Sequence, residues 1–340
     1  MNELKSPPPV ETLPAAPEST GRIRQGDCLD RVPELRREYG PFQLIYVDPP
    51  FNAGGIRKAR EAQGPRAGGA YAYVDQWGGL ENFLNMLEPR LEVLRDALSP
   101  EGSLWLQLDY RAIHDVKVCL DRVFGPSAFA GEVIWVPGNG GKRRSGPSVT
   151  HQTILIYRRG AQMVWNGDDP ALREPFSDTS LRMHFKQTDE QGRNYRERTI
   201  NGKSYRYYAD EGRRIGSVWL DCPSMTANTP LTSETTGYPT QKPESLLERV
   251  IRAASTPDGA VLDPMCGSGT TVAVAARLGR AFAGCDLNEL ACRLAAERVS
   301  RALAAPTLGT GSRDVGPSKL RSTAPSKLRS VPPTATRATR

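Results

Sequence analysis

The chain has 340 residues, a formal net charge of +7 and 38% hydrophobic residues. This composition excludes a collagen, a chain that is disordered throughout and a small disulfide-rich domain. There is no run of 18 apolar residues, so no transmembrane helix and no membrane partner are expected. Scattered cysteines and the absence of an N-terminal secretory signal favour a cytoplasmic setting. The spacing of the cysteines and histidines predicts no metal site.

Both ends of the chain are expected to be disordered, at residues 1–20 and 305–340, because they are rich in proline and poor in apolar residues. The second of these segments holds most of the positive net charge. The charge of the whole chain is therefore no argument that its folded body binds nucleic acid. The basic tail is interpreted as a linker or as an arm that contacts nucleic acid.

Between the ends, short apolar runs alternate with helical patterns. The predicted strands are Arg22–Gln25, Phe42–Val47, Ser103–Leu108, Glu132–Val136, Thr153–Tyr157, Ala260–Leu262 and Ala281–Cys285. The predicted helices are Leu29–Glu38, Leu80–Ala97, Ala112–Phe124, Pro243–Ala254, Thr270–Leu278 and Glu289–Leu303. This alternation predicts a doubly wound α/β fold, in which a mostly parallel sheet carries helices on both faces.

Two stretches interrupt the alternation. Residues 52–76 are rich in Gly, Ala and Arg and are too long for an ordinary connection, so a mobile functional loop is expected. Residues 165–236 have few apolar runs and many basic and aromatic residues, which indicates an inserted module. The folded body is thus divided into residues 21–164, the insert, and residues 237–304.

A turn with two glycines follows the predicted strand Ala260–Leu262. It reads Asp263-Pro-Met-Cys-Gly-Ser-Gly-Thr-Thr271, and its glycines let the backbone approach a ligand closely. Asp286 ends the next strand, where an acid can accept both hydroxyls of a ribose. Val272 replaces the third glycine of a dinucleotide fingerprint, and Gly269 is not followed by the lysine of a P-loop. A cofactor with an amine and a ribose, such as S-adenosylmethionine, suits these acids better than a pyrophosphate, and a purely structural turn is the alternative.

A second motif, Asp48-Pro49-Pro50-Phe51, follows the predicted strand Phe42–Val47. The prolines remove two N–H donors, so the carboxylate of Asp48 and the carbonyl of Pro49 leave an acceptor-rich backbone. Such a site favours a ligand that donates two hydrogen bonds, as the exocyclic amine of adenine or cytosine does. Phe51 offers a flat face for stacking a base. A proline turn with a capping Asp is the structural alternative.

Together the two motifs resemble those of amino-methyltransferases that act on DNA. The first precedes the second and a long insert separates them, which is similar to the permuted β group of that family. Gln25-Gly-Asp27 and Gly237-Tyr-Pro-Thr-Gln-Lys-Pro243 extend the resemblance, which covers Arg22 to Leu303. It departs from the family at Met265-Cys266, where an aromatic residue is common.

The resemblance implies a seven-stranded methyltransferase sheet with an inserted target-recognition region, and S-adenosylmethionine as cofactor. Asp263 would bind the methionine amine, Asp286 the ribose hydroxyls and Asp27 the adenine amine of the cofactor. The remaining cofactor-binding residues would be Thr240, Lys242, Pro264, Gly267, Ser268, Gly269 and Thr270. Thr240 and Lys242 would lie near the methionine end, although a segment that merely starts a helix explains their spacing equally well.

The resemblance also implies double-stranded DNA as the partner and a target base that is flipped out of the duplex. An Asp at the first position of Asp48–Phe51 is similar to enzymes that methylate N6 of adenine, with N4 of cytosine as the alternative. A catalytically inactive DNA-binding protein is a further alternative. The expected DNA contacts are Lys142, Arg143, Arg144, Arg193, Arg196, Arg198, Lys203 and Arg206, each of which a solvated surface would also explain. A homodimer and a cognate restriction enzyme are compatible with the family.

Overall fold

The computed structural model describes residues 22–50, 55–59, 70–75, 77–138, 144–225 and 234–304. The two terminal segments that the sequence predicts to be disordered therefore lie outside the described residues. So do Phe51, Lys142 and Arg143. No helix in the described part of the chain combines the length and the apolar character needed to cross a membrane.

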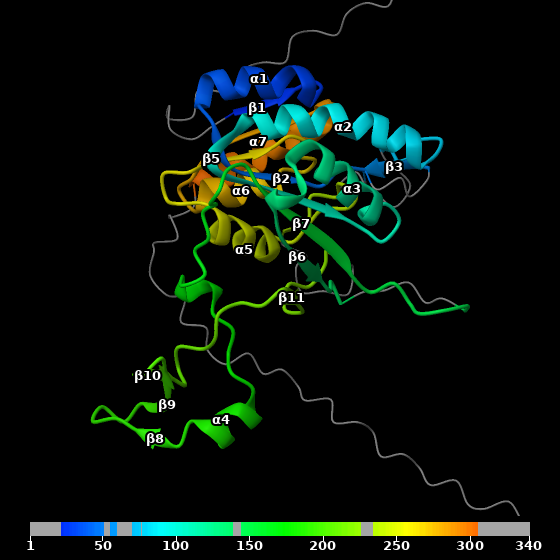
Figure 1. Cartoon of the computed structure of the whole chain (residues 1–340). Coiled ribbons are helices and arrows are strands. Elements are labelled where there is room, and N and C mark those ends of the chain that lie inside the picture. The colour runs from blue at the N-terminus through cyan, green and yellow to red at the C-terminus, as the bar shows by residue number, and fades with distance from the viewer. Residues whose placement is uncertain are drawn as a thin grey trace, which may run out of the picture. The chain divides into compact units, whose positions relative to one another are not determined.

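The centre of the fold is a sheet of eight strands in the order β1-β13-β12-β2-β5-β7-β6-β11 (Figure 1). Its strands are β1 (Arg22–Gln25), β2 (Phe42–Val47), β5 (Leu98–Leu108), β6 (Phe129–Trp135), β7 (Gln152–Arg158), β11 (Val218–Trp219), β12 (Ala260–Asp263) and β13 (Ala281–Asp286). Only β7 runs antiparallel to its neighbours β5 and β6. The predicted doubly wound, mostly parallel sheet is confirmed, and the two-residue strand β11 from the insert adds an eighth member at one edge.

Helices cover both faces of this sheet. The helices α1 (Cys28–Tyr39), α2 (Leu80–Ala97) and α3 (Ile113–Phe124) bury apolar residues in one core cluster. The helices α5 (Glu244–Ala254), α6 (Thr270–Arg277) and α7 (Glu289–Ala304) bury theirs in another. Strand β2 serves both clusters, because Leu44 and Tyr46 belong to the second and Ile45 and Val47 to the first. This alternation explains why its sequence is apolar at nearly every position.

Every predicted strand and helix is present, and Arg22–Gln25, Phe42–Val47 and Leu80–Ala97 have the predicted bounds, whereas the others have shifted ends. The largest shift is at β5, which begins at Leu98 instead of Ser103 because Leu98 already pairs with Phe42 of β2, before an irregularity in the register that ends where Ser103 pairs with Leu44. Residues 52–76 contain more than a loop. Strands β3 (Ile56–Ala59) and β4 (Ala70–Val74) pair antiparallel within that segment. A short 3₁₀ turn (Pro126–Ala128) precedes β6.

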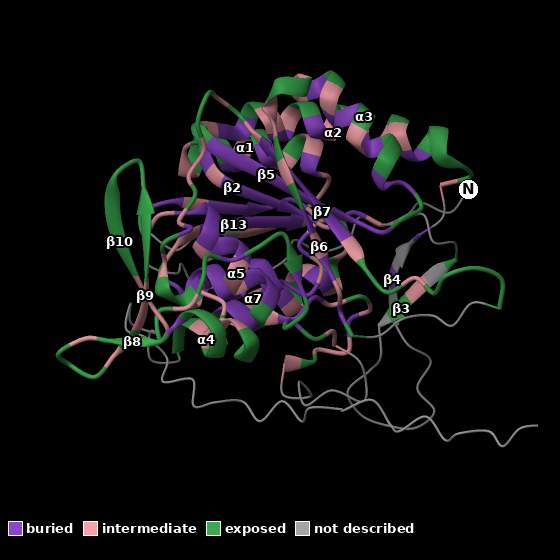
Figure 2. Cartoon of the chain, turned by 60° about the horizontal axis from the view of Figure 1, so that its bottom comes forward, coloured by how far each residue is buried: buried purple, intermediate pink, exposed green. Residues whose placement is uncertain are grey.

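The insert contains a small sheet of its own. Strands β8 (Gln187–Thr188), β9 (Asn194–Ile200) and β10 (Lys203–Tyr208) form an antiparallel meander, and helix α4 (Asp178–His184) precedes it. These elements are coloured mostly as exposed in Figure 2, whereas the central strands are coloured as buried. An antiparallel bridge between Glu174 and Arg213 closes the base of the segment.

The two ends of the insert belong to the main core. Leu172, which ends a 3₁₀ turn (Pro170–Leu172), lies in the core cluster of α5–α7 together with Ile215 and Trp219. Trp105 of β5 packs between two tryptophans of the insert, with ring centroids 6.5 Å from Trp165 and 6.4 Å from Trp219. The residues between Glu174 and Arg213 contribute no member to this core cluster. Single buried apolar residues in a polar sequence give no periodic signal, which is why composition alone does not reveal this anchoring.

Trp219 and Leu220 test this anchoring as a matched pair. Trp219 is 1% exposed, whereas its neighbour Leu220 is 69% exposed. We expect Trp219→Ala to lower the free energy of unfolding by about 3 kcal/mol, since it leaves a large cavity beside Trp105. Leu220→Ala should change it by less than about 0.5 kcal/mol. Urea unfolding measures both, and equal effects would contradict the assignment of this insert end to the main core.

Candidate active site

The candidate site lies where the strand order reverses. From β2 the chain passes through α2 to β5 on one side, and from β12 it passes through α6 to β13 on the other. Strands β2 and β12 are adjacent and parallel, with Leu262 beside Ile45, so their carboxyl ends open side by side. Such a switch point is where doubly wound sheets bind ligands. A cavity of about 520 Å³ opens there, and residues of both sequence motifs line it.

The turn after β12 is built for close backbone packing. Gly269 has φ +77°, and a Cβ at this position would lie 2.5 Å from the Cα of Ala295 in α7. Gly267 also has positive φ, and its N–H donates to Oδ2 of Asp286 at 2.9 Å. Glycine is therefore required for the turn, and the turn is tied to the end of β13. Cys266, the departure from the family pattern, is buried in the core.

Two acids at the strand ends have raised pKa values. Asp263 is 3% exposed, and burial raises its pKa to about 7, although hydrogen bonds from Thr271 and from the N–H of Met265 partly oppose the shift. Burial also raises the pKa of Asp286, against the hydrogen bonds that it accepts from the N–H groups of Asn288 and Gly267. Neither acid pairs with a cation within the described part of the chain, so both are available to a ligand.

Asp48 follows β2 and enters the same cavity. Its side chain is 18% exposed, and its Oδ2 pairs with Nζ of Lys242. Its Oδ1 is buried and has no hydrogen-bond partner. Burial raises the pKa of Asp48, the Lys242 ammonium opposes this, and the nearby Asp75 adds to it. A buried carboxylate oxygen without a partner is costly, so this atom is ready to accept a hydrogen bond from a ligand.

Thr240 and Lys242 both line the cavity, as do Pro49, Pro50 and Pro264. Lys242 was expected near the methionine end of a cofactor, and the structure shows its ammonium paired with Asp48, the acid of the other motif. Thr240 has φ +58°, a backbone conformation that is uncommon for residues other than glycine. Its carbonyl accepts a hydrogen bond from Nζ of Lys242 at 3.4 Å.

Asp27 lines the cavity with both of its oxygens engaged. Oδ1 caps α1 by accepting from the N–H of Leu29 at 2.9 Å, and Oδ2 pairs with Arg90 of α2. Burial acts to raise the pKa of Asp27, but these two partners outweigh it and the pKa is lowered. A contact with a ligand amine at this position must therefore share an oxygen with the cap or with Arg90.

Sequence reasoning missed Arg90 and the pair formed by Arg57 and Asp75. Asp75 is 2% exposed, and its Oδ2 lies 3.0 Å from Nη2 of Arg57. The alternating stretch Ala70–Val74 is typical of a strand and ends directly before Asp75, so it is a signal for this acid, whereas it does not point to Arg57 or Arg90.

The charges around the cavity leave two acids without compensation. Five carboxylates line it, and cations pair with three of them: Asp27 with Arg90, Asp48 with Lys242 and Asp75 with Arg57. Asp263 and Asp286 are the two lining carboxylates that pair with no cation in the described part of the chain. The cavity therefore suits a cationic ligand and disfavours a pyrophosphate.

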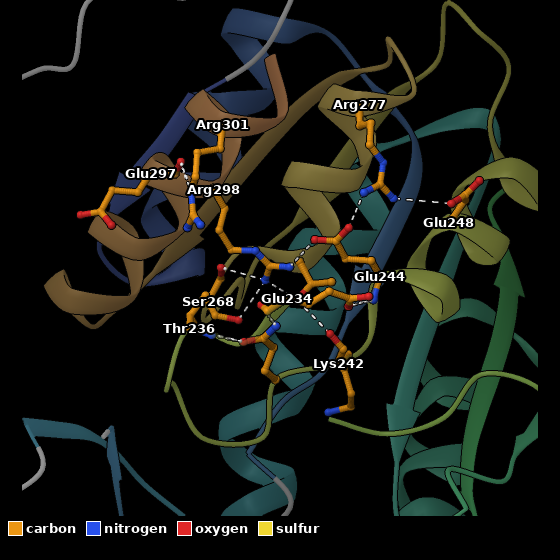
Figure 3. Close-up of polar contacts among 12 residues, drawn as sticks. Glu234, Thr236, Lys242, Glu244, Glu248, Ser268, Arg277, Glu297, Arg298 and Arg301 are labelled. Carbon is orange, nitrogen blue, oxygen red and sulfur yellow. Dashed lines mark hydrogen bonds and ion pairs between the residues drawn. The ribbon is translucent and has the colours of Figure 1, made fainter. Parts of the chain in front are cut away.

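A buried arginine contacts the glycine turn that follows β12 (Figure 3). Arg298 of α7 is 5% exposed and donates to Oγ1 of Thr270 at 2.7 Å and to Oε1 of Glu244 at 2.8 Å. Thr270 in turn donates to the carbonyl of Lys242 at 3.1 Å. The other oxygen of Glu244 pairs with Arg277. These contacts connect α7, α6 and the residue that pairs with Asp48.

The residues expected to contact DNA differ in their surroundings. Arg193 pairs with Asp210 and Glu211, and Arg206 with Glu197. Arg196 lies over aromatic rings. Arg196 has no ion pair in the described part of the chain, and neither do Arg144, Arg198 and Lys203, but only these last three are exposed.

The doubly wound sheet, the acid-rich cavity at its switch point and the lining residues Asp48, Pro49 and Pro50 agree with the resemblance to DNA amino-methyltransferases. The comparison of sequences agrees, because residues 42–297 match the family N6_N4_Mtase, described as DNA methylase. The chain belongs to this family.

Individual relatives are distant and match along most of their length. The type II methyltransferase M1.MboII of Moraxella bovis is 28% identical over 270 residues, which cover 78% of this chain and 92% of that protein. The type II methyltransferase M2.LlaDCHI of Lactococcus lactis subsp. cremoris is 24% identical over 308 residues, covering 88% and 97%. The structure of the PvuII DNA methyltransferase, a cytosine-N4-specific enzyme, is similar in fold, with a TM-score of 0.51 at 16% identity over 84% of this chain and 92% of that one.

Arg298 and Arg301 of α7 form a matched pair of buried and exposed arginines, one helical turn apart. Arg298→Met should lower the free energy of unfolding by about 3 kcal/mol, because it removes the buried partner of Glu244 and Thr270. Arg301 lies on the same helix and is exposed, so Arg301→Met should cost less than about 0.5 kcal/mol. Arg298→Lys should fall between them, because a lysine keeps the charge without the planar fork. Urea unfolding compares the three, and an Arg298→Met protein as stable as the wild type would refute the role of this network.

Proposed function

We propose that this chain transfers the methyl group of S-adenosylmethionine to the exocyclic amine of a base in double-stranded DNA, with N6 of adenine as the target. One observation carries the proposal. The buried Oδ1 of Asp48 has no hydrogen-bond partner, and Asp48 lines the same cavity as the glycine turn after β12. Family membership supports the reaction class, and the chemistry of the cavity supports the cofactor.

The cavity fits S-adenosylmethionine in charge and in size. The two uncompensated acids suit its positive charges and its ribose: Asp263 for the methionine ammonium and Asp286 for the ribose hydroxyls. A volume of about 520 Å³ is in the range of small-molecule sites. Bound there, the cofactor would supply an electrophilic methyl group on a sulfonium. Gly267 would let the backbone approach it and Ser268 would line it beside Gly267, whereas Gly269 would shape the turn through its packing against Ala295.

Asp48 and the carbonyl of Pro49 would accept hydrogen bonds from the target amine. This favours a more tetrahedral nitrogen, whose lone pair is less delocalised into the ring. Positive charge develops on that nitrogen during transfer, and a preorganised carboxylate stabilises it. Lys242 would hold the other oxygen of Asp48 in place. Because the reacting amine is buried inside a duplex, the base must be flipped out, and Phe51 would stack on it.

Adenine is proposed as the target because Asp at the first motif position resembles adenine-specific enzymes. Cytosine N4 is the alternative. The order of the two motifs along the chain supports assignment to the permuted β group, and the segment 165–236 is proposed as the target-recognition region. The homodimer and the cognate restriction enzyme remain predictions from the resemblance.

Nucleoside mass spectrometry tests the reaction. The protein is incubated with unmethylated genomic DNA and methyl-labelled S-adenosylmethionine, beside an Asp48→Ala variant. We expect labelled N6-methyladenine with the wild type and a loss of at least about a hundredfold in the variant, because Asp48 accepts from the reacting amine. Labelled N4-methylcytosine would overturn the choice of base only. No labelled nucleoside, despite bound cofactor, would refute methylation of DNA and favour an inactive DNA-binding protein.

The raised pKa of Asp263 predicts a pH-dependent affinity for the cofactor. The pKa of about 7 means that the carboxyl is mostly protonated at pH 6 and mostly ionised at pH 8. Because the cationic ammonium would bind the ionised form, the dissociation constant should be about tenfold higher at pH 6 than at pH 8. Isothermal titration calorimetry measures it.

Two variants isolate Asp263 in this titration. Asp263→Asn should bind weakly at both pH values. Asp27→Asn is the control, because partners lower the pKa of Asp27 and keep it ionised over this range, so the pH dependence should survive. A wild-type dissociation constant that is equal at pH 6 and pH 8 would contradict the role assigned to Asp263.

A further inference from the structure

The two faces of the β9–β10 hairpin differ in charge. In an antiparallel pair, directly opposed residues share a face and alternate along the strands. The register pairs Arg198 with Tyr205 and Glu197 with Arg206. One face, here called the basic face, therefore holds Arg196, Arg198, Ile200, Lys203, Tyr205 and Tyr207. The other, here called the paired face, holds Tyr195, Glu197, Thr199, Ser204, Arg206 and Tyr208. The basic face has three cations and no acid, and the paired face has one of each.

The paired face satisfies its charges internally. Arg206 pairs with Glu197 at 3.5 Å and lies 4.7 Å from the ring centroid of Tyr195. At the start of the hairpin, Arg193 lies 3.9 Å from the ring centroid of Tyr208 and pairs with Asp210. These arginines, which the sequence offered as DNA contacts, already have carboxylate partners that a phosphate would have to displace.

The basic face is divided into a packed base and an open tip. At the base, Arg196 lies 5.3 Å and 5.1 Å from the ring centroids of Phe176 and Phe185, so it joins the hairpin to the segment around α4. At the tip, Arg198 and Lys203 are exposed and pair with no carboxylate in the described part of the chain. Tyr205 is 45% exposed between them, and Ile200 is 47% exposed.

We propose that this tip, formed by Arg198, Ile200, Lys203 and Tyr205, is the surface of the insert that binds DNA, and that it enters the major groove. The inference rests on the proposed function and assigns its DNA contacts to one face of one hairpin. The major groove admits a two-stranded ribbon, and its base edges and flanking phosphates are the partners that arginine and lysine bind. Two unpaired cations beside an exposed tyrosine complement a polyanion, whereas the paired face is neutral.

The two faces supply matched variants. Arg198→Gln and Lys203→Gln change the basic face, and Arg206→Gln changes the paired face of the same hairpin. Binding to sheared unmethylated genomic DNA is measured at several salt concentrations, together with the methylation rate and the thermal midpoint of each variant. We expect each basic-face variant to weaken binding about tenfold and to reduce the slope of log affinity against log salt by about 1. Arg206→Gln should change affinity less than about twofold.

The outcomes separate this inference from the reaction itself. The proposed surface would be wrong if Arg206→Gln weakened DNA binding as much as Arg198→Gln, or if neither variant affected it. The proposed function would stand in both cases, provided that the wild type methylates DNA. DNA binding that depends on Arg198 and Lys203, with no methylated base, would support the surface and refute the reaction. Unchanged thermal midpoints and unchanged affinity for S-adenosylmethionine show that the variants are folded, because all three positions are exposed. A Tyr205→Ser variant that also weakens binding supports the same face.

Discussion

The ion pair between Asp48 and Lys242 is the contact on which the arrangement of the site depends. A buried carboxylate is expensive unless a cation or hydrogen bonds compensate it, and Lys242 compensates one oxygen only. The lysine is itself fixed, because its carbonyl accepts from Thr270 and Thr270 accepts from the buried Arg298. The acid at the end of β2 and the glycine turn after β12 are thus held by one connected set of contacts. The motif that would bind the base and the motif that would bind the cofactor cannot shift independently.

At the same edge of the sheet, two acids have no cation beside them, although the three other acids that line the cavity each pair with one. Asp263 and Asp286 accept backbone hydrogen bonds that fix their orientation, and burial still raises the pKa of both. Such groups destabilise the fold when nothing binds them, which is the usual character of functional sites. A cationic ligand would compensate the charges of these acids. The burial of the acids therefore lowers the stability of the free protein and favours binding of such a ligand.

The sequence predicts most of the fold and the two central motifs, because both depend on local patterns. Strand β2 is apolar at nearly every position and is followed by Asp48, and the glycines of the β12 turn mark a backbone with positive φ that leaves no room for a Cβ at Gly269. The contacts that cross the fold are different. Nothing near Arg298 in the sequence announces Glu244 or Thr270, and nothing near Arg90 announces Asp27. Trp219 is likewise a single apolar residue in a polar stretch, and only packing against Trp105 makes it core. Charge also misleads locally, since Arg193 and Arg198 look equivalent until their partners are known.

The division of the insert into a buried root and an exposed hairpin has a consequence for recognition. Leu172, Ile215 and Trp219 are fixed in the core that also supports α5, and the Glu174–Arg213 bridge closes the segment above them. The residues at the hairpin tip belong to neither core cluster and to none of the contacts that connect Asp48, Lys242, Thr270 and Arg298. Its exposed side chains can therefore be replaced at little cost in stability. If the hairpin tip binds DNA as proposed, the sequence that is recognised can change without disturbing the sheet edge, because the two regions rest on separate sets of contacts.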